Sequence, residues 1–80
     1  MARQAGIAEP RIDAARVLSP REREVLSLLA SGLNGSEIAA RLRISPATVR
    51  THVEHAKTKL DARTRGQAIA IAVRRSLLDD

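Results

Sequence analysis

Several residue types are missing from this 80-residue chain, which has no cysteine and no phenylalanine, tyrosine or tryptophan. The absence of cysteine excludes a disulfide framework, a thiolate nucleophile and a zinc site built on sulfur. Without aromatic residues, the core must be packed from leucine, isoleucine, valine and alanine. Because strands are enriched in aromatic and β-branched residues, this composition favours helices and predicts an all-α fold.

Long apolar runs are also missing. No stretch approaches the roughly 18 apolar residues that cross a bilayer, and the N-terminus lacks the apolar segment of a signal peptide. We therefore expect a cytoplasmic protein without membrane contact. Two histidines are too few for a metal site, and no nucleophile is paired with a base. We expect no catalytic residue, no metal and no cofactor, and therefore no enzyme.

Basic side chains outnumber acidic ones, with 14 Lys and Arg against nine Asp and Glu and a net charge of +5. The excess lies between residues 18 and 78, which hold eleven basic and five acidic residues. This charge favours a polyanionic partner such as nucleic acid. Charge alone leaves open a protein-interaction or dimerisation module whose basic surface is incidental.

Capping signals predict where the first two helices begin and end. The segment Ser19–Glu22 is a capping box with proline at the first helical position, and Gly32 is placed to end that helix in a left-handed conformation. Asn34 with Glu37 repeats the start signal for a short helix that reaches Leu42. Residues 1–17 carry no comparable signal, so we expect a flexible tail or linker there and one domain at residues 18–80.

Two further signals predict a third and a fourth helix. Ser45 followed by Pro46 starts a helix that extends to about Leu60. Thr64 with Gln67 is read as another capping box, opening a helix to about residue 78. The inward faces of the first three helices are expected to hold Val25, Leu26, Leu29, Ile38, Ala39, Leu42, Val49, Val53, Ala56 and Leu60.

The predicted helix 46–60 is polar and unbulky on its outward side, where Ala47, Thr48, Thr51, Glu54 and Thr58 lie. It follows a shorter helix after a connection of about three residues, which is typical of a helix-turn-helix. In that motif the second helix enters a DNA major groove about 12 Å wide. Short helix connections also occur in plain four-helix bundles, so the pattern alone leaves both folds open.

One series of residues is more specific than the pattern. The residues of this series match a known pattern in order, with no insertion or deletion between them. They are Leu18–Leu26, Leu29–Leu33, Glu37–Ala39, Leu42, Ile44–Ser45, Thr48–Arg50, His52–Val53, Lys59–Leu60, Arg65 and Gln67–Ala68. This series resembles the LuxR/FixJ/GerE type of helix-turn-helix DNA-binding domain. The sigma-factor helix-turn-helix that reads the promoter −35 element has a similar opening, but His52, Lys59–Leu60 and Arg65–Ala68 resemble the LuxR pattern instead.

The resemblance implies a four-helix domain without a wing that forms the output domain of a bacterial transcriptional regulator, such as a response regulator. The implied partner is double-stranded DNA with a near-palindromic operator, bound by a homodimer, and RNA polymerase is a further candidate. By position, Arg50, Thr51 and Glu54 are implied to contact bases, and Ser45 and Thr48 to contact phosphates. The other predicted DNA-binding residues are Asn34, Ser36, His55 and Thr58.

Two alternatives concern single residues on the predicted third helix. Arg50 has Glu54 one turn later, so an exposed ion pair between them competes with a role in reading guanine. Glu54 stands where the family more often has a basic or polar residue, and it is either a cytosine reader or a solvated charge. Directly after this helix, the chain also departs from the family pattern, because Asp61 stands where the family usually has glycine.

The predicted fourth helix carries two apolar stripes. We expect Ile69, Ala72, Val73 and Ser76 to face the core. The resemblance implies that this helix takes part in dimer formation, and a second apolar stripe suits a two-fold interface. The predicted dimer interface therefore comprises Gln67, Ile71, Arg74 and Leu78.

Overall fold

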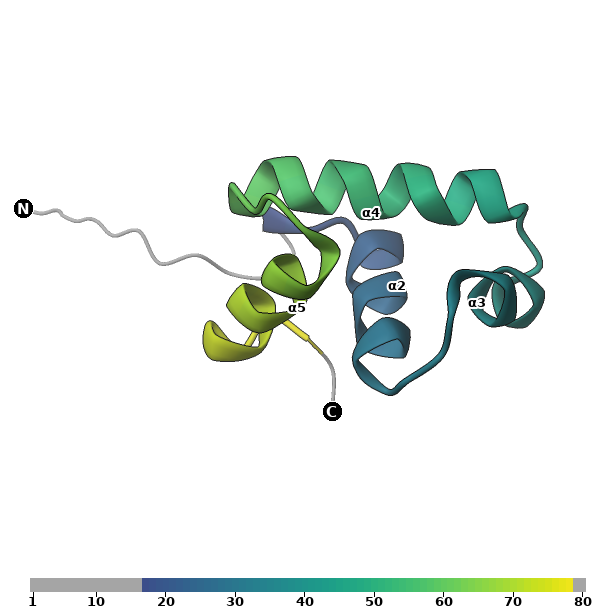
Figure 1. Cartoon of the computed structure of the whole chain (residues 1–80), viewed down its shortest axis with the longest axis horizontal. Helices are drawn as coiled ribbons and strands as arrows, with labels where there is room; N and C mark the ends of the chain where they lie inside the picture. The colour runs from purple at the N-terminus through teal and green to yellow at the C-terminus, as the bar shows by residue number, and fades with distance from the viewer. Residues whose placement is uncertain (1–16, 79–80) are drawn as a thin grey trace, which may run out of the picture.

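The computed structural model describes residues 17–78, which form four helices and no strand (Figure 1). The helices are α2 (Pro20–Ala30), α3 (Gly35–Leu42), α4 (Pro46–Leu60) and α5 (Arg65–Arg74). The longest, α4, runs along one side of the domain and covers α5, α2 and α3 (Figure 1). The predicted all-α, four-helix fold is confirmed. The predicted tail falls on residues 1–16, outside the described residues, and on Val17.

Each helix begins at the cap that the sequence predicts. A side-chain oxygen of the cap residue accepts a hydrogen bond from the third backbone N–H of the helix, which satisfies a donor that the helix itself leaves unpaired. The caps are Ser19, Asn34, Ser45 and Thr64. At α2 and α3 the box is complete, because Glu22 and Glu37 accept from the backbone N–H of the cap residue in return. These reciprocal bonds fix both helix starts.

The start of α5 differs from the prediction in one respect. Thr64 accepts from the backbone N–H of Gln67, as expected. The Gln67 side chain, however, accepts from the backbone N–H of Arg63 and not from that of Thr64. The predicted fourth capping box is therefore wrong in its second half, because the glutamine reaches one residue further back into the connector.

A residue with positive φ follows each of the four helices. Gly32 has φ 104° after α2, as predicted, and Arg43 and Asp61 have φ 60° and 56° after α3 and α4. Asp61 stands where the resemblance leads one to expect glycine. The backbone conformation explains the usual glycine, and aspartate is among the residues that adopt this region more readily than most.

Two hydrophobic clusters form the core, and α2 and α4 contribute to both. The first joins α2, α4 and α5 through Leu18, Leu26, Ala56, Leu60, Ala68, Ala72 and Leu77. The second joins α2, α3 and α4 through Val25, Ile38, Ala39, Val49 and Val53. The predicted inward faces of the first three helices are confirmed, with Leu29 and Leu42 half-buried at their edges. Packing on both sides of α2 fixes α4 along its whole length.

The predicted core face of α5 is partly wrong. Val73 is 58% exposed and Ser76 is also exposed, whereas Ile71 and Leu78, placed on the outer side, pack against the first cluster. The helix ends at Arg74, four residues before the predicted end. Beyond it, Ser76 takes a positive φ of 58° and the chain turns so that Leu77 is buried. Within α5 the buried face runs through Ala68, Ile71 and Ala72, so the predicted stripe was misplaced there, and beyond Arg74 helical periodicity no longer applies.

No helix within residues 17–78 is long and apolar enough to cross a membrane.

One buried and one exposed valine provide a matched test of the core. Val53 is 7% exposed in the second cluster, whereas Val73 is 58% exposed on α5. Val53→Asp is expected to unfold the domain, because burying an unpaired carboxylate costs several kcal/mol, on the order of the whole stability of a small domain. Val73→Asp is expected to leave the helical circular dichroism signal and its melting transition nearly unchanged. Equal melting of the two variants would contradict the assigned inward face of α4.

Candidate nucleic-acid interface

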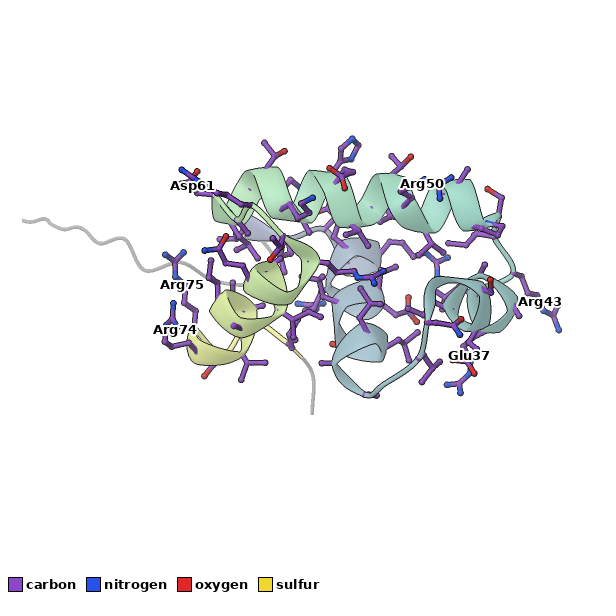
Figure 2. All side chains as sticks on the ribbon, in the orientation of Figure 1. Glu37, Arg43, Arg50, Asp61, Arg74 and Arg75 are labelled. Atoms are coloured by element: carbon purple, nitrogen blue, oxygen red, sulfur yellow. The ribbon has the colours of Figure 1, made fainter. Side chains whose placement is uncertain are left out.

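The turn between α3 and α4 is short and well defined. Arg43 takes a left-handed conformation, and the Ile44 backbone N–H donates to the Ala39 carbonyl at 3.0 Å. Ser45 then caps α4, so the connection has three residues, as the sequence predicts. The Arg43 side chain points outward at this turn (Figure 2). Helices α3 and α4 thus have the connection of a helix-turn-helix.

Seven of the nine predicted DNA-binding residues lie on or directly before α4, and most of them are exposed. Exposed are Ser45, Arg50, Thr51, Glu54, His55 and Thr58, and Thr48 is half-buried. The hydroxyls of Thr51 and Thr58 donate to backbone carbonyls one turn earlier, at 3.1 Å each. Those hydroxyls are therefore already engaged within the helix, which leaves mainly their methyl groups and lone pairs for a ligand.

Two more predicted residues, Asn34 and Ser36, come from the start of α3 and line a groove together with α4. The groove has a volume of about 560 Å³. Its apolar floor includes Val49 and Val53, and its polar walls include Arg50 and Glu54 of α4. The partial positive charge at the N-terminus of α3 is part of the same wall.

His55 is not among the residues that line the groove. Its side chain is 62% exposed, and its Nδ1 is 3.9 Å from a carboxylate oxygen of Glu22, which belongs to α2. Arg65, at the start of α5, lines the groove and was not among the predicted site residues. A signal was present in the sequence, because a basic residue follows the Thr64 cap directly and so lies at a helix start.

The alternative ion pair between Arg50 and Glu54 is not found. Glu54 Oε2 accepts instead from Lys57 Nζ at 3.1 Å. The Arg50 side chain is exposed and has no hydrogen bond or ion pair with any residue in the described part of the chain. Its five N–H donors are therefore available to a ligand.

Sequence reasoning missed a second role of Glu22, which it treated only as part of a cap. The carboxylate is 5% exposed and accepts from Lys59 Nζ of α4 at 2.7 Å and from the Ser19 backbone N–H at 2.9 Å. Burial raises the pKa of Glu22, but the Lys59 charge and the hydrogen bonds from Lys59 and Ser19 outweigh it and hold the pKa below its ordinary value of 4.5. This contact joins α2 to the C-terminal half of α4.

The sequence does contain a signal for the buried position of Glu22. Counting from Glu22, the residues three, four and seven positions later are Val25, Leu26 and Leu29, which form the apolar stripe of α2. A glutamate at the start of such a stripe faces the core, and burial of a carboxylate requires a cation. The partner Lys59 is 37 residues away, so only the fold identifies it.

The predicted dimer residues are divided by the structure. Gln67 and Arg74 are exposed, whereas Ile71 and Leu78 are half-buried against the first core cluster. The outward face of α5 is instead formed by Gly66, Gln67, Ala70, Val73 and Arg74. Arg74 and Arg75 point away from the domain at the end opposite Arg43 (Figure 2).

Comparison with known proteins agrees with this geometry. A family model described as bacterial regulatory proteins, luxR family, matches residues 16–72. The probable transcriptional regulatory protein NarL of Mycobacterium tuberculosis strain H37Rv is 49% identical over 65 residues, which are 81% of this chain and 30% of that protein. The oxygen regulatory protein NreC of Staphylococcus haemolyticus is 39% identical over 67 residues, which are 84% of this chain and 31% of that protein.

Two solved structures have the same fold. The transcription factor GerE aligns with a TM-score of 0.75 and 36% identity over 79% of this chain and 94% of its own. The response regulator ChrA of a heme-sensing two-component system aligns with a TM-score of 0.73 and 41% identity over 88% of this chain and 33% of its own. The chain spans less than a third of the length of these two curated relatives.

The depressed pKa of Glu22 predicts a stability that depends on pH. Because the folded pKa lies below the ordinary 4.5, the contribution is fully present above about pH 4.5 and is lost as the pH falls below that value. Glu22→Gln is expected to lower stability at pH 7 by about 1–2 kcal/mol and to flatten the loss between about pH 5 and 3. Thermal melting across this pH range measures both effects.

Glu24→Gln is the matched control for this test. Glu24 lies two residues away, is about half exposed and pairs only with Arg21 among the described ion pairs. Its substitution is expected to change stability by less than about 0.5 kcal/mol at any pH. If Glu22→Gln keeps the acid sensitivity of the parent chain, the buried pair with Lys59 does not contribute as described.

Proposed function

The chain belongs to the luxR family of bacterial regulatory proteins, and we propose that it binds a specific duplex DNA site by placing α4 in the major groove. Its fold is the helix-turn-helix DNA-binding fold of that family. The observation that supports the proposal most directly is Arg50, exposed on α4 and without a partner among residues 17–78. A free guanidinium on a protruding helix matches guanine O6 and N7 with two hydrogen bonds.

The two helix starts in the motif supply the proposed phosphate contacts. Ser45 and Thr48 share a hydrogen bond of 2.8 Å between their hydroxyls at the first turn of α4. Asn34 and Ser36 lie at the first turn of α3, across the groove from Arg50. Backbone N–H groups and the positive ends of helix dipoles favour an anion at both places. Such contacts set the register of α4 and leave base identity to the residues further along the helix.

We also propose that two copies bind together, through the outward face of α5 formed by Gly66, Gln67, Ala70, Val73 and Arg74. The small side chains allow close approach of two helices. Val73 is the one exposed large apolar residue among those described, so little apolar area is available for pairing. Pairing is then weak away from DNA and is driven by two neighbouring half-sites, which predicts a near-palindromic operator.

The proposed role is that of the output domain of a cytoplasmic transcriptional regulator, in which RNA polymerase is a further candidate partner. The names of the relatives support this assignment, since they describe transcriptional and oxygen regulatory proteins. The domain itself is proposed to act by binding, without catalysis.

Selection from a random duplex library tests the proposal. The chain is expected to enrich a site with two related halves and to bind it more tightly than a scrambled duplex at physiological salt. Affinity is expected to fall with salt with a slope of about −0.9 for each phosphate neutralised. Equal binding to both duplexes would indicate a non-specific basic surface. Failure to bind either one would support the interaction module.

Arg50→Ala is expected to weaken binding to the selected site by about 1–3 kcal/mol and to relax the preference at one base position of each half-site. The measurement is a fluorescence anisotropy titration on the selected duplex and on its single-base variants. Arg75→Ala is the control, because Arg75 is an exposed arginine that follows α5, away from α4 and outside the face proposed for pairing. A loss of the same size on every duplex would assign Arg50 to a phosphate.

A further inference from the structure

We propose that Lys57 is a positioning residue for DNA recognition: by holding the Glu54 carboxylate, it keeps Arg50 free and turns Glu54 into a reader of cytosine. This inference rests on the proposed function, because it assumes that α4 faces bases. It assigns a role to Lys57, which neither the family pattern nor the groove geometry marks as a binding residue.

The three side chains lie on the same flank of α4. Arg50 and Glu54 are four residues apart and both line the groove beside α3. Lys57 follows Glu54 by three residues, and its Nζ is 3.1 Å from Glu54 Oε2. Residues three and four apart are neighbours on a helix surface, so Glu54 has a choice between two cations.

Physical chemistry explains why Glu54 pairs with Lys57. A glutamate that precedes its cation along a helix forms the better pair, because that order agrees with the helix dipole. The order Glu54 then Lys57 is the favourable one, and Arg50 then Glu54 is the reverse. Lys57 is also held in place, since its side chain is only 21% exposed, whereas that of Glu54 is 58% exposed. Holding a confined cation costs less side-chain entropy than holding a free one.

The pair has two consequences for a DNA-facing surface. First, it leaves the Arg50 guanidinium without an internal partner, so binding guanine does not require an ion pair to break. Second, it partly neutralises a carboxylate that phosphates would otherwise repel. Glu54 Oε1 has no protein donor within residues 17–78 and remains able to accept from cytosine N4. Four residues of helix rise by about 6 Å, so the two side chains reach different base pairs.

A double-mutant cycle tests the proposal on the site obtained by selection. The variants are Lys57→Met, Glu54→Gln and the two together, each titrated on the selected duplex and on duplexes changed at the guanine and cytosine positions. Methionine keeps the half-buried stem of Lys57 and removes its charge. Circular dichroism melting confirms that each variant is folded before binding is compared.

Lys57→Met is expected to weaken binding to the selected site roughly tenfold and to reduce discrimination at both base positions, because the released Glu54 then pairs with Arg50. In the Glu54→Gln background, the same substitution is expected to change affinity by less than about twofold. Lys57→Arg, which preserves the pair, is expected to retain both preferences. Glu54→Gln alone is expected to lose the cytosine preference and to keep that for guanine.

Arg21→Met is the matched control, because Arg21 and Glu24 form another ion pair three residues apart at 3.1 Å, on α2. Its removal is expected to leave binding unchanged. An equal loss for Lys57→Met in both backgrounds and on every duplex would overturn the proposal and assign Lys57 to a phosphate. If Lys57→Met binds the selected duplex and its base variants with the affinities of the parent chain, the proposal is also overturned. If the parent chain selects no site, the proposed function itself has failed, which is a separate outcome.

Discussion

The burial of one apolar stripe on α4 is the constraint on which the rest of this domain depends. Val49 and Val53 pack into one cluster and Ala56 and Leu60 into the other, so α4, like α2, connects both halves of the core. A domain of this size buries little surface and has no aromatic side chain to enlarge its core. Fixing α4 from one side necessarily leaves its other side exposed. The exposed side is therefore positioned by the same contacts that fold the chain.

Acidic side chains serve local structure throughout the described residues. Glu22 and Glu37 complete capping boxes, Glu24 pairs with Arg21, and Glu54 pairs with Lys57. Because these carboxylates pair with nearby backbone or side-chain donors, they do not neutralise the other exposed basic side chains. Arg43 and Arg50 are among the basic residues that remain exposed at the motif. Other exposed basic residues, Arg74 and Arg75, lie at the opposite end of the domain (Figure 2).

The sequence predicts this fold well wherever local signals decide the structure. Caps at Ser19, Asn34 and Ser45 and the spacing of Val49 and Val53 were sufficient, because hydrogen bonds and periodicity within a few residues determine helix starts and faces. Prediction failed where distant contacts decide. The burial of Leu77 sets the end of α5, and Lys59 pairs with Glu22, a partner that only the folded chain brings near. The candidate site was located by pattern, but its ion pairs were not.

Arg43 occupies a backbone conformation that glycine adopts more easily. At φ 60° a non-glycine residue in the left-handed region is disfavoured by roughly 1 kcal/mol, and glycine would fit the same backbone without that cost. The chain instead keeps a long cationic side chain there, pointing outward from the turn that joins α3 to α4 (Figure 2). A variant optimised only for thermal stability would replace this residue early. Arg43→Gly would therefore relieve backbone strain and remove a positive charge at the turn in the same step.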